Sequence, residues 1–292
     1  MLLPDPGPVV RSHKAAGRPF RAGGVESFVR EAGEGPPVVC LHGVPASCFV
    51  YRKVLDALAA RGLRGVAFDL PGLGLAERPP DFDYTWTGLG RFARDAVDAL
   101  GLERFHLVVH DIGGPVGFEL AAAAPERVRS LTVLNTLVLV DRFERPWLME
   151  PFAVRGLRRA WLAAMTPATF LPLMYLAGVK DPRASSPAEL MGYADLLKRG
   201  DGGEAFLKIM RGFERTAAKR DLYVSAVREC PYPVQVVWGR DDPALPLARE
   251  GEAARRAAGL DRIDALPGRH FLQEEQAPAI AERVASLAAR RE

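Results

Sequence analysis

The stretch VVHDIGGPVGFELA, residues 108–121, decides the fold because it joins an apolar run to a helical pattern through two glycines. The apolar run FHLVV at 105–109 predicts a strand that is buried on both faces. Gly113 and Gly114 let the chain turn tightly into the helix that follows. We therefore expect the side chain of Asp111 at the end of the strand and beside a helix N-terminus, where a negative charge is favoured.

Two interpretations of Asp111 are open on these residues alone. The spacing of small residues is that of a nucleophile elbow, with Asp where the motif G-x-S-x-G has Ser. An Asp that only caps the following helix is an equally common arrangement. Residues elsewhere in the chain have to decide between them.

Outward from this stretch, apolar runs alternate with helical patterns, which predicts βαβ units on a parallel sheet. Further strands are expected at 37–41, 65–68, 130–134, 234–238 and 262–265, and helices at 50–61, 88–100, 115–124, 245–258 and 277–290. Between them the strand signal vanishes and proline-broken helical pieces take over. We therefore predict a core of residues 1–137 and 217–292 with a helical insertion at 138–216, and a site where the insertion covers the carboxyl ends of the strands.

Two loops after the later strands carry side chains that could complete a catalytic site. WGRDD places Asp242 just past one strand, with Asp241 as the fallback, and PGRHF places His270 after the last strand. An Asp that caps a helix and an inert loop histidine are the structural alternatives, but chance explains all three residues in this order poorly. In the order nucleophile, acid and histidine, the motifs resemble those of the α/β-hydrolase family.

The loop LHGVP at 41–45 resembles the HG-x-P loop of that family. The resemblance implies that the backbone N–H groups of Val44 and Ile112 form an oxyanion hole. His42 is expected to brace this loop, and Asp69 is expected to hold a turn in the loop after the next strand.

A carboxylate nucleophile indicates which electrophile it attacks. Asp111 attacking an sp³ carbon leaves an ester, whereas a serine would leave an ether that an adjacent base could not hydrolyse. Asp111 is ionised at neutral pH, so His270 is free to activate water in a second step. Each amide of the oxyanion hole would stabilise the negative charge that develops on the ester carbonyl by about 3 kcal/mol. Alkyl halides and epoxides are the substrates that follow.

Over nearly its whole length the chain resembles a haloalkane dehalogenase of the α/β-hydrolase superfamily. The resemblance is carried by HGVPASCFVYRKV, DLPGLGLAERP, DYTW, HDIGG, VLNT, FERTAAKRD, WGRDD and RHFLQE. It implies an eight-stranded, mostly parallel α/β sheet flanked by helices, with an inserted helical cap. Such enzymes hold the halide with a Trp after the nucleophile and a second Trp from the cap, or with an Asn in the HG-x-P loop. In this chain the position after the nucleophile is Ile112 and the position of the loop Asn is Val44. The cap Trp corresponds to Trp161, which either donates to the halide or packs in the core of the cap.

Epoxide hydrolases share the Asp nucleophile and use cap tyrosines to protonate the opening oxygen, which makes Tyr175 and Tyr193 candidates, with packing as the alternative role. Six apolar residues either line a pocket or pack the insertion: Phe143, Trp147, Phe152, Met165, Phe170 and Met174. The leading prediction is dehalogenation of a small apolar substrate through an ester on Asp111. Epoxide hydrolysis is the alternative, and a catalytically silent binding protein on the same fold is the third hypothesis.

Composition excludes several other classes of protein. Of 292 residues, 48% are hydrophobic and 26% are charged, which excludes a disordered chain, a collagen and a membrane bundle. The net charge is only +3 and the basic residues are scattered, so no nucleic-acid partner is expected. Three cysteines without a CxxC pair predict neither a disulfide framework nor a zinc site. With no signal peptide or membrane span visible, we expect no membrane partner and a cytoplasmic monomer or weak homodimer that uses water and no metal or cofactor.

Overall fold

A single eight-stranded sheet lies at the centre of the computed structural model, which describes residues 7–291. Its order is β1-β2-β4-β3-β5-β6-β7-β8. β2 runs antiparallel to both of its neighbours, and the remaining pairs are parallel. The prediction of an eight-stranded, mostly parallel sheet is therefore confirmed. The strands are β1 (Arg18–Ala22), β2 (Val25–Ala32), β3 (Pro37–Leu41), β4 (Arg64–Phe68), β5 (Phe105–Asp111), β6 (Val128–Thr136), β7 (Val234–Gly239) and β8 (Asp264–Leu266).

The β1–β2 hairpin is the part of the sheet for which the sequence pattern predicted no strands. β1 lies at the sheet edge, and four of its five residues are not buried. An edge strand of this kind lacks the apolar run that identifies a strand covered on both faces. The final predicted strand at 262–265 is also shifted, because β8 spans only Asp264–Leu266.

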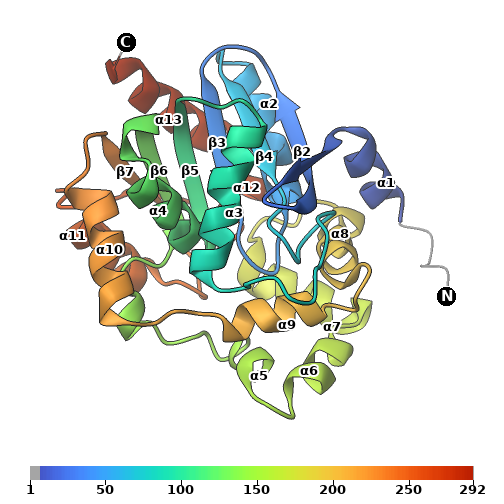
Figure 1. Cartoon of the computed structure of the whole chain (residues 1–292). Coiled ribbons are helices and arrows are strands. Elements are labelled where there is room, and N and C mark those ends of the chain that lie inside the picture. Colours follow the sequence, from blue (N-terminus) through green and yellow to red (C-terminus); the bar gives the residue numbers. More distant parts are fainter. Residues whose placement is uncertain (1–6, 292) are drawn as a thin grey trace.

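Helices cover both faces of the sheet (Figure 1). α4 packs against α3 and α10 on one face, and α2 packs with α13 on the other. The helices that flank the sheet are α2 (Arg52–Ala59), α3 (Trp86–Ala99), α4 (Gly113–Ala123), α10 (Ala217–Arg228), α11 (Glu252–Ala257) and α13 (Ala277–Ala288). Two further helices of this part of the chain are α1 (Pro8–Ala15) and α12 (Leu272–Glu275).

Between β6 and α10 the chain forms short helices that gather at one end of the sheet, the lower end in Figure 1. They are α5 (Glu150–Ala153), α6 (Arg158–Ala164), α7 (Pro167–Leu173), the π-helix η4 (Met174–Gly178), α8 (Pro187–Lys198) and α9 (Glu204–Arg211). Prolines occupy the first turns of α5, α7 and α8, where a missing N–H costs nothing. We call residues 138–216 the helical segment.

Within residues 7–291 no single helix is long and apolar enough to cross a membrane, although α6 and α7 with η4 pass that test together as a pair bent by 90°. The cytoplasmic location stays a prediction. It rests partly on residues 1–6, which lie outside the described part of the chain.

Candidate active site

Asp111 stands at a sharp turn between β5 and α4. Its φ of +52° is left-handed, a conformation that residues other than glycine rarely adopt. A Cβ at Gly114 would collide with the hydroxyl of Thr136, so the helix can approach β6 only with glycine there. The turn presents the carboxylate to a cavity instead of to the interior of the sheet.

The loop after β3 holds one oxygen of this carboxylate. The N–H of Val44 donates to Asp111 Oδ1 at 2.7 Å. A side chain at Gly43 would collide with that same oxygen, so glycine is needed for the close approach. His42 braces the loop, because its Nε2 accepts from Leu70 N at 3.0 Å while its Nδ1 faces the Gly43 carbonyl at 2.9 Å.

Asp242 and His270 complete the constellation from the loops after β7 and β8. His270 Nδ1 donates to Asp242 Oδ2 at 2.9 Å, and His270 Nε2 lies 3.6 Å from Asp111 Oδ2. Asp242 Oδ1 also accepts the N–H of Ala244 at 2.8 Å. The fallback residue Asp241 is turned outward and pairs with Lys180. The structure thus brings together Asp111, His270 and Asp242, and leaves Asp241 outside.

The charges of these residues are mutually supporting. Burial acts to lower the pKa of His270, but the carboxylates of Asp242 and Asp111 raise it to about 10. Burial acts to raise the pKa of Asp111, but contact with the protonated His270 and the N–H of Ile112 holds it below its ordinary value. Both directions favour a protonated imidazole between two carboxylates.

Asn135, at the end of β6, is a site residue for which sequence reasoning proposed no role. Its Nδ2 donates to Asp242 Oδ2 at 2.6 Å, and its Oδ1 accepts from Gly239 N at 2.9 Å. Its φ of +27° is left-handed, which an asparagine tolerates better than most residues. The signal was available, because Asn135 is the only asparagine of the chain and lies at a strand end within VLNT.

Replacing Asn135 by alanine should both destabilise the fold and slow the reaction. The buried N–H of Gly239 loses its partner and Asp242 Oδ2 loses one of its two donors, at a cost of about 1–3 kcal/mol. We expect a lower free energy of unfolding in urea and slower turnover. Gln235→Ala is the matched control, since this amide of β7 donates to Thr132 on β6 and to the Arg283 carbonyl on α13, away from Asp242. Equal turnover in the two variants would contradict the role given to Asn135.

The loop that carries His270 is anchored from two sides. His110 Nε2 donates to the His270 carbonyl at 2.8 Å, and burial lowers the pKa of His110 to about 4, so it stays neutral. On the other side, the N–H of Phe271 donates to the Gly178 carbonyl at 2.8 Å. The imidazole is therefore positioned by the strand of the nucleophile and by the helical segment together.

A cavity of about 580 Å³ lies between the sheet and the helical segment, and Asp111 and His270 are in its wall. Most of the remaining wall is apolar. All six apolar residues for which pocket lining or packing was left open line it: Phe143, Trp147, Phe152, Met165, Phe170 and Met174. The two polar catalytic candidates thus stand in a wall that is otherwise mostly apolar.

The other candidates from the helical segment are placed differently from expectation. Trp161 lines the cavity, but its indole N–H donates to the Leu148 carbonyl at 3.1 Å and is not directed at Asp111. Tyr193 is buried and its hydroxyl donates to Glu274. Tyr175 is also absent from the cavity wall. Of the two roles left open for each of these side chains, the placements favour packing, because contacts inside the protein occupy the Trp161 indole and the Tyr193 hydroxyl and Tyr175 lies outside the cavity wall.

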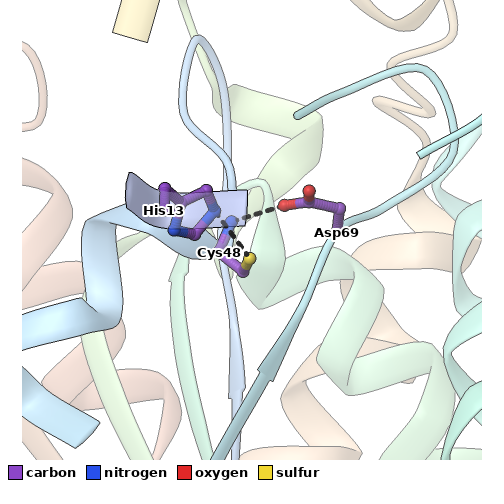
Figure 2. Close-up of side chains that lie close together, drawn as sticks. All are labelled: His13, Cys48 and Asp69. Atoms are coloured by element: carbon purple, nitrogen blue, oxygen red, sulfur yellow. Dashed lines mark hydrogen bonds between the residues drawn. The ribbon is translucent and has the colours of Figure 1, made fainter. Parts of the chain in front are cut away.

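His13, Cys48 and Asp69 form a second buried cluster (Figure 2). Each side chain offers one atom of a kind that binds metal ions, and these three atoms lie within 4.8 Å of one another. Cys48 N donates to Asp69 Oδ1 at 2.7 Å, and Cys48 Sγ lies 3.6 Å from His13 Nε2. Burial lowers the pKa of His13 to about 4 and raises that of the Cys48 thiol well above its ordinary value. Asp69 Oδ2 accepts Leu75 N at 2.7 Å. Neutral side chains and occupied carboxylate oxygens fit a structural clamp that ties α1 to two loops, which agrees with the turn-holding role expected for Asp69.

Two aspartates and a histidine follow the strands of this sheet, and this combination of fold and residues is typical of the α/β-hydrolase class. The model of the alpha/beta hydrolase fold family matches residues 36–277, so the chain belongs to that family. It is 30% identical to a haloalkane dehalogenase of Mesorhizobium japonicum over 89% of this chain and 86% of that one. It is 27% identical to an uncharacterized hydrolase of Saccharomyces cerevisiae over 90% and 93%. Among solved structures, it superposes on an epoxide hydrolase of Vigna radiata with a TM-score of 0.74 at 24% identity, covering 94% of this chain and 97% of that one.

Proposed function

We propose that this protein is a hydrolase that acts on an sp³ carbon through an alkyl-enzyme ester on Asp111, with alkyl halides as its leading substrate class. The observation that carries the proposal is the carboxylate at the turn after β5, with Oδ1 held by Val44 N–H and Oδ2 free toward His270 and the cavity. Haloalkane dehalogenases among the relatives at 29–30% identity support the same class.

In the first step Asp111 Oδ2 attacks the carbon that bears the leaving group. A C–O bond forms while the carbon–halogen bond breaks, and the halide departs with the bonding electrons. The apolar cavity desolvates the attacking carboxylate and holds an apolar chain against it. The alkyl group is then an ester of Asp111.

In the second step water hydrolyses this ester. His270 Nε2 takes a proton from water, and the oxygen of that water attacks the Asp111 carbonyl carbon. The negative charge moves to Oδ1, where the N–H groups of Val44 and Ile112 stabilise it. Collapse breaks the bond between the Asp111 carbonyl carbon and Oδ2, the departing alkoxide takes the proton from His270 and leaves as the alcohol, and the Asp111 carboxylic acid loses its proton to restore the carboxylate. Asp242 and Asn135 hold the imidazole in orientation, and the cycle uses side chains and water alone.

The two substrate classes differ in whether the leaving group needs a proton donor, and this difference favours alkyl halides over epoxides. A halide ion departs without a proton, whereas an opening epoxide oxygen needs an acid. The hydroxyl of Tyr193, expected to supply it, is directed to Glu274. With Ile112 and Val44 at the positions of two halide donors, we expect bromides to react faster than chlorides, since bromide is the better leaving group.

We also propose that residues 138–216 act as a cap over a core formed by residues 1–137 and 217–292. Helices from this segment supply most of the cavity wall opposite Asp111. The proposed partners are an apolar substrate and water. A volume of about 580 Å³ admits substrates larger than the small ones predicted from sequence.

The two steps should respond differently to pH. In the free enzyme the two carboxylates raise the pKa of His270 to about 10, and Asp111 stays ionised because its own pKa is lowered. Alkylation removes the charge of Asp111, so the pKa of His270 falls and the imidazole can lose its proton. We expect the ester-hydrolysis rate to fall about tenfold per pH unit below that lowered pKa, while the alkylation rate stays flat from about pH 5 to 8. Single-turnover kinetics with a bromoalkane measures both, and a hydrolysis rate flat over that range would refute the base role.

A further inference from the structure

Large apolar side chains that face solvent are concentrated in one part of the molecule. Among the described residues they are Trp147 (73% exposed), Val154 (38%), Leu157 (57%) and Leu176 (56%), all in the helical segment. Single exposed apolar residues are ordinary, but several of them gathered in one segment of the fold mark an interaction surface. We call these four residues the apolar rim.

The apolar rim is continuous with the cavity. Trp147 and Leu176 are largely exposed and also line the cavity that contains Asp111, so they lie where it meets solvent. Trp161 connects Leu157 to this mouth. Its backbone N–H donates to the Leu157 carbonyl at 2.9 Å, and its indole N–H donates to the carbonyl of Leu148, the residue after Trp147.

Basic side chains flank the rim. Arg155 and Arg158 lie on either side of the Gly156–Leu157 pair, and within residues 7–291 neither makes an ion pair. Arg155 and Arg159 are exposed and Arg158 is half-buried, and the carboxylate of Glu204 pairs with Arg159 and also attracts Arg158. The surface therefore offers apolar groups together with three arginines, two of which share one carboxylate.

Three kinds of occupant can be compared on this basis. A second copy meeting the same face through a two-fold axis would bring arginines against arginines. A protein partner seated on the rim would close the cavity mouth. An anionic bilayer matches both features, because Trp and Leu side chains insert into the membrane interface and arginines bind lipid phosphates. Apolar solutes dissolved in the bilayer could then enter the cavity through its mouth.

We propose that the apolar rim docks this protein on an anionic lipid surface and that apolar substrates enter the cavity from the bilayer. The second clause rests on the proposed function, and the first does not. This departs from the sequence-based expectation of no membrane partner, because composition does not reveal which apolar side chains a folded segment leaves exposed.

The test is co-sedimentation with phosphatidylcholine vesicles, with or without an equal share of phosphatidylglycerol, at low and high salt. The wild type should bind the anionic vesicles, and salt should weaken binding. Arg155→Gln with Arg158→Gln should lower the partition coefficient about thirtyfold, since each arginine contributes roughly fivefold. Leu157→Ser should lower it roughly tenfold. The control, Arg61→Gln with Arg104→Gln, removes equal charge before β4 and β5, at the opposite end of the strands, and should bind like the wild type.

None of these substitutions is in the cavity wall, so activity on a dissolved bromoalkane should be unchanged and serves as the check on folding. Equal binding to both vesicle types, or binding lost equally in the control, would overturn the proposal. So would a wild-type dimer in sedimentation equilibrium that Leu157→Ser dissociates, since the rim would then join two copies. Failure of the proposed function would appear separately, as absence of an Asp111 ester in vesicle-free assays.

Discussion

Replacing His270 by glutamine should stop turnover after the first chemical step, so that enzyme exposed to a bromoalkane accumulates as an alkyl ester on Asp111. Attack needs only the ionised carboxylate, which remains. Hydrolysis needs a base 3.6 Å from Asp111 Oδ2, which glutamine cannot supply. We expect steady-state turnover to fall on the order of 10³-fold or more. Intact mass measures the adduct, and peptide mapping locates it.

The matched control is His106→Gln, since His106 is a buried histidine of β5, the strand that carries Asp111, where it contacts Ser130 and lies outside the cavity wall. This variant should turn over normally and carry no adduct. Thermal unfolding of both variants separates a chemical effect from loss of the fold. An active His270→Gln enzyme, or a folded one that forms no adduct with any electrophile, would contradict the ester mechanism.

The same variant decides between the two substrate classes when it is exposed in parallel to a bromoalkane and to an epoxide. A bromoalkane adduct on Asp111 would establish dehalogenation despite Ile112 and Val44 at the halide-donor positions. An adduct from the epoxide alone would make the protein an epoxide hydrolase. Its acid would then have to be a group other than Tyr193, which donates to Glu274.

The sheet and its site could be predicted from sequence because topology does most of the positioning. Parallel strands end at one edge, so Asp111, Asp242 and His270 converge if each follows a strand. Backbone geometry then fixes the details, such as the left-handed φ of Asp111. Asn135 escaped because its role depends on the register of β6 beside β7, which no local pattern encodes.

The helical segment could be predicted as a segment but not residue by residue. Most of its helices are only four to eight residues long, and short helices leave many packings of similar composition. Tyr193 illustrates the difficulty, because its hydroxyl donates to Glu274 and not toward the cavity. Glu274 is a buried carboxylate that also accepts from Arg52 and Ser185. A charge cluster assembled from distant parts of the chain cannot be read from the spacing around one tyrosine.

Replacing Asp111 by asparagine should abolish turnover, by on the order of 10⁴-fold or more, and should leave the fold intact. Asparagine tolerates the left-handed φ of +52°, and its carbonyl oxygen can still accept the N–H of Val44. It cannot displace a halide, because an amide oxygen is a poor nucleophile. Asp56→Asn on α2, whose side chain is 68% exposed, is the control and should be fully active. Activity that returns with the mass gain of deamidation would strengthen the assignment.

Loss of activity alone leaves one alternative, in which Asp111 acts as a base for direct attack of water on the substrate. The two mechanisms differ in where oxygen goes during a single turnover of wild-type enzyme in water enriched in oxygen-18. Through the ester, the first alcohol carries the unlabelled Oδ2 of Asp111, and the label enters the Asp111 carboxylate. Direct attack would instead place the label in the first alcohol and leave Asp111 unlabelled. Since Oδ1 is held by Val44 and Oδ2 faces the cavity, we expect the first result, and a labelled first alcohol would refute the nucleophilic role of Asp111.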